Sequence, residues 1–268
     1  MSRCDDKVVT RRVLTDAGIG VPRGMLAGDE SENEHFLDAV GEVVVKPARG
    51  EQGKGITVGV TEPAGLDRAI HLAMEHRPRV LIEERVHGDD LRVVVIDGDV
   101  VAAAVRRPAS VTGTGAHTIA ELIDRQSRRR SAATGGESTI PLDTTTLACV
   151  EEAGYQISDV LPAGEVLAVQ RTANLHTGGT IHDVTAQLHP TLASVAVAAA
   201  EAIGIPVTGV DLIVDDPAQE RYVVIEVNER PGLANHEPHP TAERFMDLLF
   251  PATSALPRFA DPDDLGGT

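Results

Sequence analysis

Aromatic residues and cysteines are scarce in this sequence. Its 268 residues include no Trp, two Tyr, four Phe and two Cys, so a core has to be built from Val, Leu, Ile and Ala. The length suits one large domain or two small ones. Cys4 and Cys149 form neither a disulfide nor a metal-ligand spacing pattern, and such sparing use of cysteine is typical of the reducing cytoplasm. We therefore expect a cytoplasmic protein.

Long apolar runs and basic charge are also lacking. No run approaches the roughly 18 apolar residues needed to span a bilayer, and the polar N-terminus does not resemble a secretory signal. The chain carries 24 Lys and Arg against 41 Asp and Glu, a formal net charge of −17. This balance argues against nucleic acid and against an anionic membrane as partners.

Lysine is much rarer than arginine in this sequence. It occurs only at Lys7, Lys46 and Lys54, and all other basic residues are arginine. A sequence that otherwise uses arginine can keep lysine where a compact charge is needed, for instance against phosphate. Chance retention is the alternative, and for Lys54 the count alone does not decide between them.

Hydrophobic periodicity and turn signals predict a mixture of helices and strands without regular βαβ alternation. Ser31 and Glu34 form a capping box, and Asp97-Gly98 predicts a hairpin. We expect α+β architecture with largely antiparallel sheets. The segment 125–138 is polar and has no apolar period, which predicts an exposed or mobile stretch. The expected helices are 7–17, 31–39, 63–75, one from Thr118, 191–203 and 241–250, and the expected strands are 42–46, 56–60, 79–84, 91–96, 100–105, 164–170, 206–214 and 223–228.

Two late strands carry acids within strongly apolar runs. Glu226 and Asn228 are spaced by two, which places both side chains on one face of a strand, and an antiparallel pairing would bring Asp211 beside them. Carboxylate and amide oxygens without a Cys or His nearby suit Mg²⁺ that is shared with substrate phosphates. The alternative is that the acids lie on a solvated strand face. The pattern favours a metal–nucleotide site.

The loop from Gly50 to Gly55 has the composition of a phosphate-binding loop. It has two residues between Gly50 and Gly53-Lys54, too few for a P-loop, and its glycines do not follow the dinucleotide fingerprint. A flexible hairpin tip remains, whose backbone N–H groups could close over phosphates, with Lys46 on the strand that leads into it.

The order of these parts resembles the ATP-grasp superfamily, from Asp6 to the helix after Pro240. The resemblance implies two α+β lobes that clasp ATP, an N-terminal lobe at 1–88 and a C-terminal lobe at 89–250, followed by a flexible tail at 251–268. It places adenine against the backbone near Glu84 and Val86. The implied nucleotide ligands are Lys7, Lys46, Gly53, Lys54, Gly55, Glu83, Glu84, Val86 and Asp90, and the implied Mg²⁺ ligands are Asp211, Glu226 and Asn228.

Three further stretches, 113–123, 171–179 and 226–232, are similar to the ATP-grasp module of cyanophycin synthetases. The segment 229–244 is still more similar to N-acetylglutaminylglutamine synthetases. These stretches supply the substrate candidates Asn174, Gly178, Gly179, Arg230, Gly232 and His236. Both families carry a further N-terminal half, whereas this chain begins at the ATP-grasp module. An excised domain that needs a partner domain and a stand-alone ligase both fit the sequence.

The resemblance implies carboxylate–amine ligation. ATP phosphorylates a carboxylate, and an amine attacks the acyl-phosphate to form an amide. This chemistry needs cations at the phosphates and at the acyl oxygen, so Arg171, Arg92 and Lys46 are the catalytic candidates. The expected substrates are glutamine-like amino acids or a dipeptide. An ATP-binding module without activity of its own, a kinase, and a cyanophycin- or glutathione-type ligase are the alternatives. The sequence leaves a homo-oligomer open.

A zinc site is not expected. The spacing of the histidines at 176, 182, 236 and 239 suits neither a zincin nor a zinc finger, and no cysteine lies near them. We expect His176 or His236 to contact substrate instead.

Overall fold

The computed structural model describes residues 3–50, 54–233 and 239–251. Within them, three short 3₁₀ helices occur at Arg3–Asp5, Leu175–Thr177 and Thr185–Gln187. The α-helices are α1 (Lys7–Asp16), α2 (Glu30–Val40), α3 (Pro63–His76), α4 (Ile119–Ala133), α5 (Thr144–Glu152), α6 (Pro190–Ile203) and α7 (Thr241–Leu249). The strands are β1 (Gly24–Leu26), β2 (Val43–Pro47), β3 (Thr57–Val60), β4 (Val80–Glu84), β5 (Asp89–Ile96), β6 (Asp99–Arg107), β7 (Ser110–Thr112), β8 (Val166–Ala168), β9 (Thr180–Asp183), β10 (Val207–Val214) and β11 (Tyr222–Asn228).

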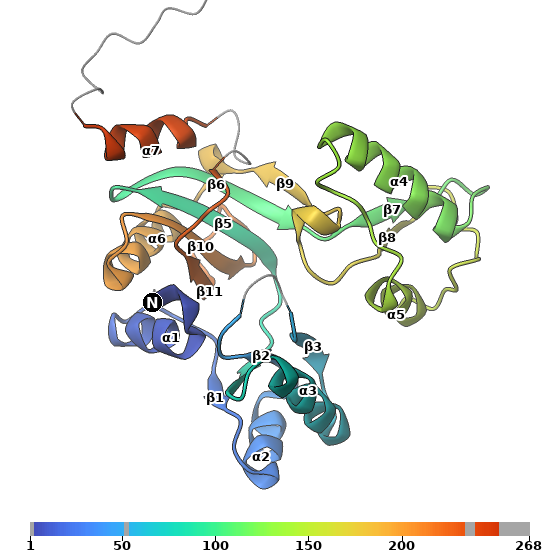
Figure 1. The fold of residues 1–268 in the computed structure, drawn as a ribbon, viewed down its shortest axis with the longest axis horizontal. Coiled ribbons are helices and arrows are strands. Elements are labelled where there is room, and N and C mark those ends of the chain that lie inside the picture. Colours follow the sequence, from blue (N-terminus) through green and yellow to red (C-terminus); the bar gives the residue numbers. More distant parts are fainter. Residues whose placement is uncertain (1–2, 51–53, 234–238, 252–268) are drawn as a thin grey trace, which may run out of the picture.

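The first part of the molecule is a four-stranded antiparallel sheet in the order β1-β4-β2-β3, with α2 and α3 against it (Figure 1). Its core joins Leu37 of α2 and Leu66 of α3 to Val43, Val45 and other strand residues. The predicted hairpin of β2 and β3 is confirmed, because these strands pair on either side of the glycine loop.

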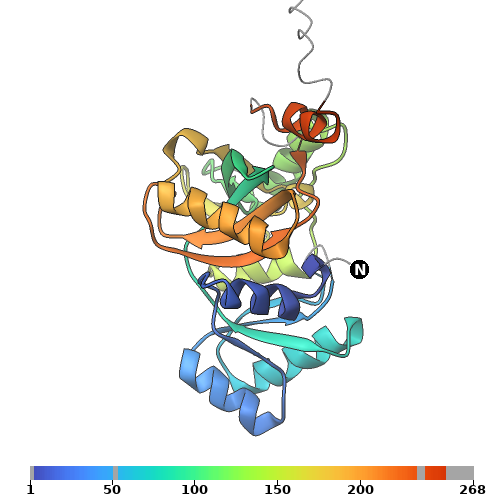
Figure 2. The ribbon, with the colours of Figure 1, turned by 90° about the vertical axis from the view of Figure 1, so that its left-hand side faces the viewer.

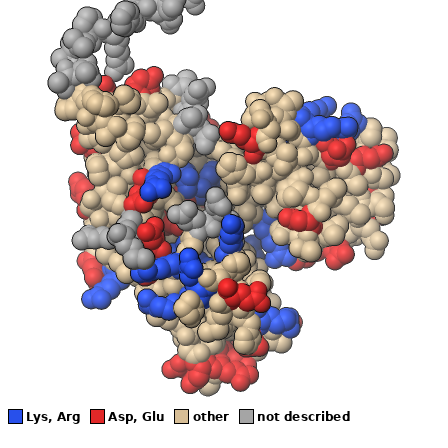
Figure 3. Space-filling view, viewed as in Figure 1, with Lys and Arg blue, Asp and Glu red and all other residues tan. Residues whose placement is uncertain are grey.

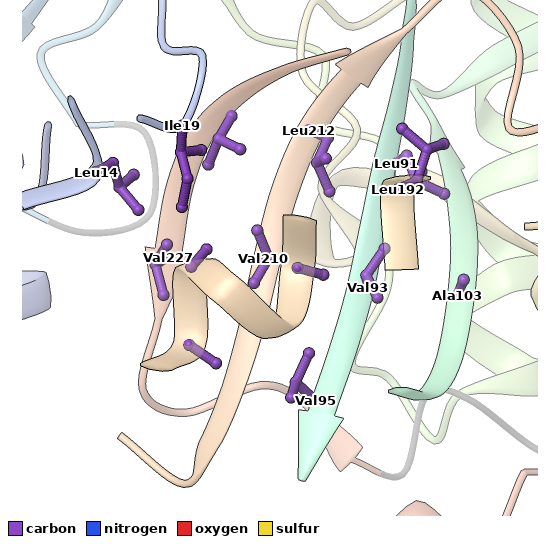
Figure 4. Packing of buried hydrophobic residues seen from close by; sticks show 14 of the residues in the cluster. Leu14, Ile19, Leu91, Val93, Val95, Ala103, Leu192, Val210, Leu212 and Val227 are labelled. Carbon is purple, nitrogen blue, oxygen red and sulfur yellow. The ribbon is translucent and has the colours of Figure 1, made fainter. Parts of the chain in front are cut away.

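The second part is a five-stranded antiparallel sheet in the order β11-β10-β5-β6-β9. Helices α6 and α1 lie on one face of it, where Leu192 of α6 and Leu14 of α1 join a cluster that includes Val93 and Leu212 (Figures 2 and 4). Helix α7 lies on the other face, and Phe245 and Leu248 pack there against Val94, Ile96, Ala102 and Val207. The predicted α+β architecture with antiparallel sheets is confirmed.

The third part is small and lies between β6 and β9 in the sequence. It combines the two-stranded sheet of β7 and β8 with α4 and α5 around its own core, which includes Ile119, Ile123 and Leu161. Figure 1 shows it beside the five-stranded sheet and above the first part. Three parts therefore surround one central region.

The segment 125–138 is exposed over most of its length, as predicted, but its helical structure was not predicted. Arg125–Ala133 continues α4 as helix, because Thr118 and Glu121 form a capping box and the inward face of the helix continues through Ser127 and Arg130 in place of large apolar residues. Helix α2 begins earlier than expected, since Asp29 caps it with Glu32 rather than Ser31 with Glu34. Helix α5 and strands β1, β7 and β9 had no sequence prediction.

Some predictions lie outside the described residues. These include Gly53, His236 and the tail beyond Pro251. The predicted domain division at residue 88 stays a prediction, although β1–β4 lie before it and the five-stranded sheet after it. No helix within the described ranges is both long and apolar enough to cross a membrane.

Candidate nucleotide and metal site

The polar residues of the five-stranded sheet lie together because two β-bulges change the phase of its strands. In β11, Leu212 pairs with Val224 but Asp211 pairs with Glu226, so Ile225 is the extra residue. Without it, Glu226 would follow Val224 onto the core face, and the bulge instead turns it to the side of Asp211. A second bulge lies in β6, between the residues that pair with Val94 and Val95. It turns the Arg106 side chain away from the core face to the side of Asp211.

Asp211 is the centre of this group. It is 6% exposed, and its direct partner on β5, Arg92, binds it through two hydrogen bonds, from Nε to Oδ1 at 2.7 Å and from Nη2 to Oδ2 at 2.8 Å. Asn228 donates Nδ2 to Oδ2 at 3.1 Å. The predicted pairing that brings Asp211 beside Glu226 and Asn228 is therefore confirmed, while the metal role of the three residues stays a prediction.

Arg106 joins the candidate ribose ligand to the candidate metal ligand. It lies opposite Asp90 in register and donates Nη2 to Asp90 Oδ1 at 2.6 Å, while the same nitrogen lies 3.2 Å from Asp211 Oδ2. Burial raises the pKa of Asp211, but Arg92 and Arg106 outweigh it and hold that pKa below its ordinary value. Burial, only partly offset by Arg106, raises the pKa of Asp90.

Lys7 connects this sheet to the glycine loop. It is the first residue of α1, and its Nζ donates to the carbonyl of Gly50 at 2.8 Å and lies 3.5 Å from Glu226 Oε1. Lys7 therefore contacts both Gly50, the first residue of the predicted phosphate loop, and the predicted metal ligand Glu226. Lys54 is exposed, and Gly55 has φ +71°, where a Cβ would clash with His76.

The first part of the molecule contributes a second buried ion-pair group. Lys46 pairs closely with Glu83, and Arg11 of α1 lies 3.3 Å from the same carboxylate. Both Lys46 and Glu83 are 5% exposed. The next residue, Glu84, accepts hydrogen bonds from the backbone N–H and the side chain of Arg23, which lower its pKa more than burial raises it. Val86 is half-buried just beyond β4.

Arg171 lies in a different place from Arg92. It donates to the backbone carbonyl of Val58 on β3 at 3.2 Å and pairs closely with Glu152 of α5, so it joins the third part to the first. Burial raises the pKa of the neighbouring Cys149 thiol despite this guanidinium, which argues against a thiolate nucleophile.

The substrate candidates near Arg171 form a tight turn. The Asn174 side chain accepts the His176 N–H, and Gly178 has φ +86° with no room for a Cβ beside Ile140. Arg130 of α4 donates to the Gly179 carbonyl at 3.0 Å. Arg230 and Gly232 are exposed beyond β11. Whether these residues bind substrate stays a prediction.

The distribution of charge favours an anionic ligand. Figure 3 shows Lys and Arg side chains gathered in the hollow where the three parts meet, while acidic side chains cover the outer tip formed by α2. In a chain with a net charge of −17 this gathering is local and runs against the overall balance. It concentrates positive potential where a polyphosphate would be clasped.

The donor set at Asp211 fits Mg²⁺. Among the described residues, no three His, Cys, Asp or Glu side chains form a protein-only metal cage. Two carboxylates and one amide oxygen on adjacent strands leave the remaining positions to water and phosphate, which is the coordination that Mg²⁺ prefers at nucleotide sites. The oxygen of Asn228 is free for this role because its amide nitrogen is the atom that contacts Asp211.

Comparison with known proteins decides the family. The ATP-grasp domain family matches residues 4–233. The chain belongs to this family. The predicted superfamily and the ATP-grasp fold are therefore confirmed, as are ATP and Mg²⁺ as the predicted cofactors.

Individual relatives of this ATP-grasp chain are much longer than it is. The cyanophycin synthetase of Trichormus variabilis is 36% identical over 261 residues, which cover 92% of this chain and 29% of the relative. The glutathione biosynthesis bifunctional protein of Streptococcus agalactiae is 31% identical over 246 residues, covering 86% and 32%. The crystal structure of a bifunctional glutathione synthetase from Pasteurella multocida matches with a TM-score of 0.60 and 27% identity, covering 92% and 36%. The chain thus spans about a third of these proteins.

Four arginines that contact the candidate site residues had no sequence prediction: Arg11, Arg23, Arg106 and Arg130. Arg106 could have been found from the Asp97-Gly98 hairpin only if the bulge in β6 were known, because a regular register would place Val105 opposite Asp90. Arg11 lies one turn after Lys7 on the same side of α1, a helical spacing that can be read from the sequence.

Proposed function

We propose that this ATP-grasp protein is a carboxylate–amine ligase that forms a peptide or amide bond through an acyl-phosphate. The observation that carries the proposal is the meeting of Lys7 with Glu226 beside the Asp211 group, at the hollow where cations gather. The kinship with cyanophycin and glutathione synthetases supports amino-acid substrates. Glutamine-like substrates are our choice, because the segment 229–244 resembles N-acetylglutaminylglutamine synthetases.

Different residues of the chain bind the phosphates, the ribose, the metal and the adenine. Lys7 and Lys46 hold phosphate oxygens, and the ion pair with Glu83 holds Lys46 in place within a buried environment. Asp90 binds the ribose hydroxyls. Asp211, Glu226 and Asn228 would hold Mg²⁺, which when bound neutralises charge at the transferring phosphoryl group. Adenine lies against the backbone from Glu84 to Val86.

Arginines assist the acyl step. The reacting carboxylate and the later acyl oxygen carry negative charge that a guanidinium stabilises, and removing one such group costs on the order of 10²–10³ in rate. Arg92 and Arg171 are the proposed donors, with Asn174, Gly178, Gly179, Arg230, Gly232 and His236 as the substrate-binding residues. No protein nucleophile is needed. We assign the reaction to the cytoplasm.

The proposal is tested by a screen for ADP release. Purified protein with Mg·ATP is given amino acids and N-acylated amino acids in pairs, and the products are identified by mass. We expect ADP and phosphate to appear together with an amide product, and hydroxylamine to trap an acyl-phosphate. Glu226→Ala should abolish turnover with the fold intact, whereas Glu220→Ala, an exposed acid before β11, should not. Unchanged turnover in Glu226→Ala would contradict the site.

A second candidate function follows from the length of the relatives. Because the chain spans about a third of each, it also fits an ATP-binding module that acts only with a partner domain. Tight ATP binding without stimulation of hydrolysis by any amino acid would favour this second function. A phosphorylated product that hydroxylamine does not intercept would indicate a kinase.

A further inference from the structure

The carboxylate of Asp211 is almost fully occupied by protein donors. Each carboxylate oxygen offers about two lone pairs. Among the residues that the structure describes, Oδ2 is approached by Arg92, Arg106 and Asn228, whereas Oδ1 receives only Nε of Arg92. A metal ion that binds Asp211 therefore meets Arg92 on the one oxygen that retains capacity.

Arg92 is held less firmly than Arg106. Within the described ranges, both hydrogen bonds of the Arg92 side chain go to Asp211, so losing this partner would free the guanidinium from all of them. Arg106 is also bound to Asp90 through two nitrogens and would keep that partner. A divalent ion at Asp211 would replace the charge that Arg92 now supplies and would repel its guanidinium.

Arg92 lies over small residues of the two neighbouring strands. On the same face of β10 it packs over Gly209, where a Cβ would lie 3.5 Å from Arg92 Nε and 3.1 Å from Pro231. The residue opposite Arg92 on β6 is Ala104, which also has a small side chain. Arg92 therefore lies over small residues, in the direction of the Pro231–Gly232 turn where the proposed substrate residues follow.

We propose that Arg92 is a placeholder cation: it neutralises Asp211 before the metal arrives, competes with the divalent ion for Oδ1, and is released when the ion binds. The released guanidinium then serves the acyl group, so that the cation needed for the second half-reaction becomes available only after the metal is loaded. This inference rests on the proposed function for the fate of Arg92, but the competition itself does not require turnover.

The competition is tested with Mn²⁺ alone, counted by electron paramagnetic resonance on nucleotide-free protein. We expect Arg92→Gln to bind Mn²⁺ about tenfold more tightly than the wild type, because the competitor is gone, which corresponds to about 1.4 kcal/mol. Arg92→Lys keeps the charge and should stay near the wild type. Arg106→Gln is the matched control and should not tighten binding, since Arg106 contacts Oδ2 and positions both carboxylates. Equal tightening in Arg92→Gln and Arg106→Gln, or none in Arg92→Gln, would overturn the proposal.

A second measurement keeps the test independent of how Arg92→Gln folds. In the wild type labelled with ¹⁵N-arginine, the Nε–H signal of Arg92 is assigned by its loss in Arg92→Lys. Saturating Mg·ADP should shift this signal strongly and leave that of Arg106 nearly in place. An Arg92 signal that does not respond would contradict the release. Failure of the ADP-release screen with a positive Mn²⁺ result would instead reject only the ligase function.

Discussion

The two faces of the five-stranded sheet are formed by the same strands but differ in polarity. One face presents Val93 and Leu212 to α6 and is buried along its length (Figure 4). The other face is apolar at one end and charged at the other. At one end Val94 and Val207 pack under α7, and at the other Asp211 and its arginines face the hollow. The site exists because α7 covers only half of this face, and because bulges turn Glu226 and Arg106 away from the core.

This comparison separates stability from function along a single strand. Neighbouring residues of β10 alternate between the faces, so Leu212 belongs to the core and Asp211 to the site. A substitution at one should change the free energy of unfolding through packing, and at the other through charge. The following predictions test the separation.

The largest effect on stability is expected at Asp211. Asp211→Asn leaves the half-buried Arg92 without the buried carboxylate that neutralises it, and we expect a loss of about 3–5 kcal/mol in the free energy of unfolding at neutral pH. The pKa of Asp211 is lower in the folded than in the unfolded chain. Its contribution is therefore present above the ordinary carboxyl pKa, about 4, and is lost as pH falls through the folded value.

Denaturant unfolding across pH measures this. The difference between the wild type and Asp211→Asn should shrink below about pH 4. Asp215→Asn, at an exposed ion pair with Arg221, is the control and should stay within about 0.5 kcal/mol of the wild type. Equal losses of stability in the two variants would show that the buried ion pairs of Asp211 contribute no more than an exposed ion pair.

A loss of stability with a different pH dependence is expected for a substitution on the core face. Leu212→Ala removes a fully buried side chain and should cost about 3 kcal/mol through the cavity it leaves. Unlike Asp211→Asn, this difference should not vary with pH, and the folded variant should keep the Mg²⁺ dependence of its ATP affinity. A change in that dependence, measured by calorimetry, would contradict the separation of the two faces.

The smallest effect is expected under α7. Leu248→Ala removes a half-buried side chain that packs on the apolar half of the second face, and should cost about 1–2 kcal/mol. Leu249, the next residue, is 52% exposed and offers a matched control. Leu249→Ala should change the free energy of unfolding by less than about 0.5 kcal/mol. Equal costs would mean that α7 does not cover the sheet as described.

Much of the fold could be predicted from the sequence, because helices with apolar stripes and hairpins with turn residues carry local signals. The spacing of Glu226 and Asn228 likewise predicted their common face. Helix α4 was missed beyond Asp124 because Ser127 and Arg130 form its inward face, where they contact the backbone of Ile140 and Gly179. Their polarity hid the helical period.

The part of the site that could not be predicted depends on register. The strands of this sheet are apolar almost throughout, so their alternation does not mark where an extra residue is inserted. Ile225 looks like any other strand residue, yet it decides which way Glu226 points. The partnership of Arg106 with Asp90 and Asp211 arises in the same way, from contacts between strands that are distant in the sequence.

The central claim is that the half of the sheet face left open by α7 binds a nucleotide through Mg²⁺. Calorimetric titration with ATP, with and without Mg²⁺, tests this claim most directly when the wild type is compared with Glu226→Gln. Glu226 is partly exposed and pairs with Lys7, so this variant should fold. We expect Mg²⁺ to strengthen ATP binding to the wild type and to have little effect on the variant. An equal gain from Mg²⁺ in both proteins would contradict the account.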